Sequence, residues 1–205
     1  MIKNIIFDLG NVIINYNQKK IINNFTEKEE EIKYIYDEIF HAPEWTLMDL
    51  GDITNDEAIE IINKRNKFKY EKLTQEFLHE WHKKQPINRD IVEIAKILKN
   101  NGYNLFVLSN MANQTYEYFK NDEFFSLCTG IVISAHEHVK KPDEKVYRLL
   151  LDRYNLNAEE CLFIDDDDSG KNYETANKIG IKGRRIMPNQ AEDVKKLLLE
   201  FNVKI

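Results

Sequence analysis

The chain has 205 residues, with 29 basic and 35 acidic side chains and a formal net charge of −6 at pH 7. Its composition, 42% hydrophobic and 11% aromatic, is that of a globular protein and excludes a disordered or low-complexity chain. The acidic balance argues against nucleic-acid binding. No apolar run approaches the ~18 residues that a membrane span needs, and the N-terminal apolar stretch is too short for a secretory signal. We therefore expect a cytoplasmic protein without a membrane partner.

Short apolar runs typical of buried parallel strands recur along the chain. They lie at residues 5–7, 105–108, 131–133 and 162–164, with a weaker fifth run at 184–186. Between them, apolar residues repeat with helical spacing at 91–98, 146–154 and 194–201. This alternation predicts an α/β fold, a Rossmann-like doubly wound parallel sheet with helices on both faces.

Residues 16 to 88 break the alternation, because they contain helical patterns and no strand run. The pattern at residues 54–66 begins with Thr54 and Glu57, which have the spacing of a capping box. A loop at 43–51 is expected to be mobile. The segment predicts a helical cap domain at residues 16–88, inserted into a core domain formed by residues 1–15 and 89–205. The helices are expected at 18–25, 27–40, 54–66 and 73–83.

Polar residues follow four of the predicted strands, where ligands collect in a doubly wound sheet. Taken singly, the first two are common in turns and helix caps and the lysine is typical of a solvated loop, whereas the acidic run already favours a cation. Together they supply a carboxylate, a hydroxyl, an ammonium group and an acidic cluster. Such a set indicates a site for a phosphate group and a hard divalent cation. In chain order the residues are Asp8, Ser109 with Asn110, Lys141, and Asp165 to Asp168.

These motifs resemble the haloacid dehalogenase superfamily, in its phosphatase branch with a helical cap, over nearly the whole chain. The first motif, with glycine at position 10, especially resembles that of phosphatases that act on glucose 1-phosphate. The matching residues are Phe7-Asp8-Leu9-Gly10-Asn11-Val12, Leu108-Ser109-Asn110, Lys141-Pro142-Asp143, and Phe163-Ile164-Asp165-Asp166 followed by Asn172 and Ala176.

The resemblance implies an enzyme that hydrolyses a small phosphorylated metabolite such as a sugar phosphate. Asp8 would attack phosphorus and form an aspartyl-phosphate, and Lys141 would neutralise negative charge. Ser109 and Asn110 would bind the phosphoryl group. The cofactor would be Mg²⁺, held by Asp8, the main-chain carbonyl of Gly10, Asp165 and Asp166.

Two features depart from the family pattern. Gly10 stands where most of these phosphatases carry the aspartate that transfers protons to and from the leaving group. Either the leaving group departs without such help, or a residue of the cap takes the place of the missing aspartate, with His41, Glu44 and Asp49 as candidates. The acidic run is also two residues longer than the family spacing. The metal pair is either Asp165 and Asp166, which we favour, or Asp167 and Asp168, and we expect Asp168 to cap the next helix.

Two other functions are compatible with the sequence. A metal-independent 2-haloacid dehalogenase would not need an acid at position 10, although four carboxylates would repel its substrate. A weakly catalytic sensor of a phosphorylated ligand would also explain the missing acid. Trp45 and Trp81 are expected to pack within the cap. The substrate and the oligomeric state stay open.

Overall fold

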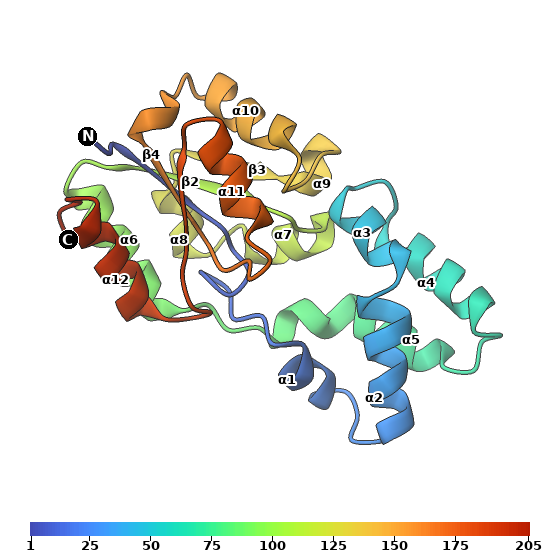
Figure 1. Ribbon diagram of the computed structural model, residues 1–205. Helices are drawn as coiled ribbons and strands as arrows, with labels where there is room; N and C mark the ends of the chain where they lie inside the picture. Colours follow the sequence, from blue (N-terminus) through green and yellow to red (C-terminus); the bar gives the residue numbers. More distant parts are fainter.

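The computed structural model describes all residues from Met1 to Ile205. Its centre is a five-stranded sheet in which all neighbouring strands run parallel, in the order β3-β2-β1-β4-β5 (Figure 1). The strands are β1 (Asn4–Phe7), β2 (Asn104–Ser109), β3 (Gly130–Ile133), β4 (Cys161–Asp165) and β5 (Lys182–Arg185). The predicted doubly wound α/β fold is confirmed.

Helices cover both faces of the sheet, because side chains alternate between the faces along each strand. In β1, Ile5 and Phe7 join the hydrophobic cluster under α6 and α12, whereas Ile6 joins the cluster under α10 and α11. The helices around the sheet are α6 (Arg89–Asn100), α7 (Asn113–Phe119), α8 (Glu123–Leu127), α9 (Ser134–Glu137), α10 (Glu144–Arg153), α11 (Lys171–Lys178) and α12 (Ala191–Glu200), with a 3-10 turn, η3 (Ala158–Glu160).

Helix α6 shows how the sequence sets these elements. The side chain of Asn88 caps its first turn by accepting a hydrogen bond from the Ile91 amide at 3.4 Å. The helix gives way after Asn101 to Gly102, whose φ of 86° lies in the left-handed region that glycine adopts without strain. The chain then enters β2 two residues later.

The remaining helices lie beside the sheet, at the lower right of Figure 1. They surround a hydrophobic cluster of 14 buried residues, which includes Ile35, Ile62, Phe77 and, from the loop after β2, Ala112. The predicted limits of the two domains, at residues 15/16 and 88/89, stay a prediction. The elements are α1 (Gln18–Asn23), α2 (Glu29–Ile35), the π-helical turn η1 (Tyr36–Phe40), α3 (Pro43–Asp49), α4 (Asn55–Arg65), α5 (Glu71–Glu80) and the 3-10 turn η2 (Trp81–Lys84).

Helix α4 begins as the sequence predicts, with Thr54 and Glu57 forming the capping box. No helix was expected within residues 43–51, which was wrong, because Pro43 to Asp49 forms α3. Proline is tolerated in a first helical turn, and Met48 is buried against the cluster. The fifth strand, expected at 184–186, begins two residues earlier and ends one residue earlier, since β5 runs from Lys182 to Arg185.

Candidate active site

The strand order reverses direction beside β1. The chain proceeds from β1 to β2 and β3 on one side, and β4 and β5 lie on the other. Loops that diverge at such a point leave a crevice at the carboxyl ends of the strands. Asp8 directly follows β1, and Asp165 is the last residue of the neighbouring β4. The fold therefore brings these two carboxylates to the same crevice.

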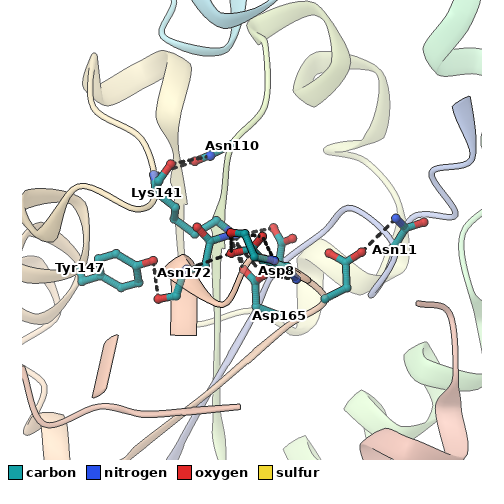
Figure 2. A network of polar contacts seen from close by, with 10 residues as sticks. Asp8, Asn11, Asn110, Lys141, Tyr147, Asp165 and Asn172 are labelled. Atoms are coloured by element: carbon teal, nitrogen blue, oxygen red, sulfur yellow. Dashed lines mark hydrogen bonds and ion pairs between the residues drawn. The ribbon is translucent and has the colours of Figure 1, made fainter. Parts of the chain in front are cut away.

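The ammonium group of Lys141 joins the two carboxylates. Its Nζ lies 2.8 Å from Asp8 Oδ1 and 2.7 Å from Asp165 Oδ2, and its side chain is only 2% exposed (Figure 2). Asn110 fixes the backbone of this lysine. Its side-chain oxygen accepts a hydrogen bond from the Lys141 amide at 2.8 Å, and its Nδ2 donates to the Lys141 carbonyl at 2.9 Å. Asn110 thus positions the lysine, a contact that the sequence did not indicate.

Burial and charge shift the acidities of these groups. Burial raises the pKa of Asp8 to about 7; Lys141 opposes the increase, and Asp165 and Asp166 add to it. Burial by itself lowers the pKa of Lys141, but Asp165 and Asp8 outweigh burial and raise it above its ordinary value. The lysine therefore stays charged, and its single positive charge faces three acidic groups.

Asp166 completes a cluster that could hold a metal ion. Carboxylate oxygens of Asp8, Asp165 and Asp166 lie within 4.8 Å of one another. The amide of Asn11 orients Asp166 by donating to its Oδ2 at 3.0 Å. Carboxylates at this spacing repel one another unless a cation or a proton offsets their charge, and Mg²⁺ prefers such oxygen ligands. The donor set therefore fits a hard divalent cation. The carbonyl of Gly10, the fourth expected ligand, accepts no hydrogen bond within the chain.

The four acidic residues at the end of β4, Asp165 to Asp168, do not share one environment. Asp165 accepts hydrogen bonds from Asn172 Nδ2 at 3.2 Å and from the Asp167 amide at 2.8 Å. Asp167 in turn accepts a hydrogen bond from the Asn172 amide at 3.0 Å at the start of α11. The expectation that Asp168 caps this helix is wrong, because Gly170 is the N-cap residue and it is Asp167 that accepts the hydrogen bond from the first turn. The metal-ligand pair favoured from the sequence, Asp165 and Asp166, is the one that lies beside Asp8.

Ser109 ends β2, and its side chain is buried at the edge of the crevice. Its hydroxyl group makes no hydrogen bond within the chain. The crevice opens into a cavity of about 490 Å³. Tyr16 and Arg185 line this cavity and were not identified from the sequence, because neither belongs to a strand-end motif. Its lining consists of Asp8, Gly10, Asn11, Tyr16, Asp166, Asp167, Asp168, Asn172, Arg185 and Pro188.

A smaller cavity of about 180 Å³ lies between α3 and the loop after β2. It shares Gly10 and Tyr16 with the larger cavity. Trp45 and Trp81 pack together as expected, with ring centroids 4.8 Å apart, and they also form a wall of this cavity. The lining consists of Gly10, Ile14, Tyr16, Trp45, Asp49, Trp81, Gln85, Asn110, Met111, Ala112 and Thr115.

Of the three candidates for proton transfer, only Asp49 lines a cavity beside Gly10. Glu44 is buried in an ion pair with Arg65, which donates to its two oxygens at 2.9 and 3.0 Å. The ring of His41 stacks against Tyr36, and its Nδ1 lies 2.7 Å from the Tyr36 carbonyl oxygen. Both groups are therefore engaged elsewhere.

Comparison with known families agrees with this geometry. The haloacid dehalogenase-like hydrolase family matches residues 5–185. The chain belongs to this family. The match spans β1 to β5 and so includes every element that carries a site residue of this hydrolase. None of the curated proteins matched the sequence.

Solved structures share the fold of this hydrolase. A HAD family enzyme, bt-2542 of Bacteroides thetaiotaomicron, in complex with magnesium and inorganic phosphate, has a TM-score of 0.75 and 21% identity, with 93% of this chain and 96% of that chain covered. A predicted HAD-like hydrolase of Porphyromonas gingivalis has a TM-score of 0.79 and 21% identity, covering 97% and 98%. The L-2-haloacid dehalogenase of Xanthobacter autotrophicus has a TM-score of 0.66 and 15% identity, with 98% of this chain and 83% of that chain covered.

None of the helices has both the length and the apolar character of a bilayer-spanning segment.

Proposed function

We propose that this protein is a Mg²⁺-dependent phosphatase that hydrolyses a small phosphorylated metabolite through an aspartyl-phosphate on Asp8. The observation that carries the proposal is the arrangement of three carboxylates around one buried lysine at the switch point of the sheet. The related enzyme from Bacteroides thetaiotaomicron, whose structure contains magnesium and inorganic phosphate, supports this choice of cofactor and substrate.

The residues of the crevice have complementary roles in this reaction. Asp8, fixed by Lys141 at 2.8 Å, presents its other carboxylate oxygen to phosphorus. Lys141 offsets negative charge as the phosphoryl group approaches. Ser109 supplies a free hydroxyl group for a phosphoryl oxygen. Asn110 keeps the lysine in place through its two backbone hydrogen bonds.

Asp8, the Gly10 carbonyl, Asp165 and Asp166 would hold the metal ion. When bound, Mg²⁺ supplies positive charge that offsets the repulsion between the phosphate ester and these carboxylates.

A sugar phosphate such as glucose 1-phosphate is the substrate class that we favour. Two features support this substrate class: the first motif, which with Gly10 resembles that branch of the family, and the smaller cavity. Trp45 and Trp81 offer aromatic surface to the apolar face of a sugar ring. The small volume of that cavity suits a small leaving group.

The test is phosphate release from a panel of phosphate esters that includes glucose 1-phosphate, with Mg²⁺ or with EDTA. We expect turnover only with Mg²⁺, loss of turnover in Asp8→Asn, and normal turnover in the control Asp52→Asn, which removes a surface carboxylate paired with His138. Full activity of Asp8→Asn would refute the proposal. Binding of an ester without phosphate release would favour the sensor instead.

A haloacid dehalogenase is the second candidate, because the chain shares its fold with an L-2-haloacid dehalogenase. The charges around Asp8 argue against it. A haloacid carries a carboxylate, and Asp165 and Asp166 would repel it while Lys141 is already paired with Asp8 and Asp165. Halide release from a 2-haloacid in the presence of EDTA would support the dehalogenase and contradict the phosphatase.

A further inference from the structure

The smaller cavity contains a single carboxyl group, that of Asp49. This cavity meets the larger one at Gly10 and Tyr16, so an ester whose phosphoryl group lies against Asp8 can extend its leaving group toward Asp49. On the basis of the proposed phosphatase function, we propose that Asp49 protonates the leaving oxygen of the ester and then takes a proton from the water that hydrolyses the phosphorylated Asp8.

The other acidic groups near Asp8 are engaged or lie outside the smaller cavity. Asp168 is exposed and lines only the larger cavity. Asp165 is paired with Lys141 and accepts two further hydrogen bonds, and Asp166 belongs to the cluster that fits a cation. Asp167 accepts hydrogen bonds from Ser169 and from the start of α11. Asp49 is thus the carboxyl group that remains available on the side of the leaving group.

The position of Asp49 is fixed by the sheet and not only by α3. The hydroxyl of Ser134, the residue that directly follows β3, donates to the Asp49 carbonyl and accepts from the Met111 amide at 2.9 Å. Ser134 is fully buried. Gly51 then passes so close to α9 that a Cβ there would lie 2.1 Å from the Ala135 carbonyl oxygen. These contacts hold the end of α3 against the strand ends, where a proton donor needs a defined position.

The surroundings of Asp49 bring the pKa of its carboxyl group close to physiological pH. Burial raises its pKa to about 7, opposed by Lys140 and by the backbone amide of Ala112. Tyr16 is the other titratable residue of the cavity, and burial raises the pKa of its hydroxyl, so it stays uncharged. A group with a pKa near the working pH serves well both as acid and as base.

The same cavity indicates what the leaving group must be. The buried Nε2 of Gln85, which lines it, has no hydrogen-bond partner in the protein. A polar side chain in the lining of a cavity suits a ligand that carries hydroxyl groups. Together with the aromatic wall of Trp45 and Trp81, it favours a hydroxylated ring. Such an alcohol is a poor leaving group and therefore needs the proton that Asp49 supplies.

The reaction balances with these groups alone. A carboxylate oxygen of Asp8 forms a bond to phosphorus while the bond from phosphorus to the ester oxygen breaks. The bonding electron pair goes to that oxygen, which takes the proton of Asp49 and leaves as an alcohol. Water then gives a proton to the Asp49 carboxylate as its oxygen bonds to phosphorus, and the electron pair of the breaking bond returns to Asp8.

The decisive experiment measures single-turnover release of the alcohol in the presence of Mg²⁺. For glucose 1-phosphate, or whichever sugar phosphate the panel identifies, we expect Asp49→Asn to lose ~10²–10⁴-fold in rate, the usual contribution of a general acid. For nitrophenyl phosphate, whose leaving group departs without a proton, we expect a far smaller loss. Asp52→Asn, three residues away and outside the cavity, is the control and should match the wild type with both esters.

A rescue variant gives an independent readout. A Cβ at Gly10 would have no atom within 4 Å, so an aspartate fits at the junction of the two cavities. We expect Gly10→Asp to restore sugar release in the Asp49→Asn background, because it supplies a new acid from the other side. Gly10→Ala in the same background separates the carboxyl group from the added bulk and should restore nothing.

The outcomes distinguish this inference from the proposed function. An active wild type with equal losses for both esters in Asp49→Asn, or with no loss, would overturn the role of Asp49 and leave the phosphatase intact. The absence of rescue by Gly10→Asp would also contradict it. A wild type that releases phosphate from no ester would overturn both. Should Asp49→Asn fail to fold, the wild type itself decides: sugar release should fall above pH ~7 and nitrophenol release should not.

Discussion

Replacing Asp49 with asparagine should stabilise the protein at neutral pH. The pKa of Asp49 rises from 3.8 to about 7, mainly because its carboxyl group is buried. Since one pKa unit corresponds to 1.36 kcal/mol, ionising this group in the folded protein costs at most about 4 kcal/mol. The cost is smaller to the extent that water enters the cavity, because part of the residue as a whole stays exposed to solvent. Asparagine has nearly the same shape and carries no charge.

The sign of the pH dependence follows from proton binding. Between about pH 4 and pH 7 the folded protein binds more protons at Asp49 than the unfolded chain does, so its contribution to stability falls as the pH rises. Asparagine cannot titrate. The stability difference between Asp49→Asn and the wild type should therefore be near zero below pH about 4, grow through this interval and level off above pH about 7.

Urea unfolding at several pH values measures this difference directly. Asp52→Asn provides the matched control, because its carboxyl group is exposed and such substitutions change stability by no more than about 0.5 kcal/mol. A variant Asp49→Asn that is less stable than the wild type near pH 8 would refute the reasoning. So would a stability difference that does not change with pH.

Three further predictions concern the crevice and the contact between α3 and the sheet. Lys141→Met should abolish turnover and, because it leaves carboxylates buried without their cation, cost about 3–5 kcal/mol in urea unfolding; a stable, active variant would contradict the ion-pair arrangement. Mg²⁺ at a hundredfold excess over its dissociation constant should add about 2.7 kcal/mol to the unfolding free energy, and Asp166→Asn should need more Mg²⁺ for the same gain. Equal Mg²⁺ affinities of the wild type and Asp166→Asn in calorimetric titration would contradict Asp166 as a ligand. Gly51→Ala should lower the melting temperature more than Gly102→Ala, because both have left-handed backbones but only Gly51 meets a neighbouring carbonyl; equal losses would disprove that contact.

The sequence was sufficient for the first four strands of the sheet and for the residues at their ends, whereas the fifth strand, Lys182-Gly183-Arg184-Arg185, lacks the apolar run that would mark it. Buried strands are short and strongly apolar, and the helices between them have a clear apolar period, as in α6. Parallel topology then brings the ends of β1 and β4 together, so the proximity of Asp8 to Asp165 and Asp166 follows from the pattern. The capping box of Thr54 and Glu57 was equally local and equally clear.

Contacts between distant segments could not be predicted in this way. Helix α3 has only seven residues, too few to show a period, and it is stabilised by burial of Met48 in the cluster. The roles of Asn110 and Gln85 depend on backbone and side-chain positions that no local spacing encodes. The choice among His41, Glu44 and Asp49 likewise needed the positions of their partners, such as Arg65.

The most direct test of the central claim is mass spectrometry of the protein after acid quenching during turnover of a phosphate ester. The account predicts one phosphoryl group on the peptide that contains Asp8, formed only when Mg²⁺ is present and absent in Asp8→Asn. Because hydrolysis of this intermediate needs Asp49, the Asp49→Asn variant should accumulate more of it with nitrophenyl phosphate. A phosphoryl group on any other residue, or turnover of the ester without labelling of Asp8, would contradict the account.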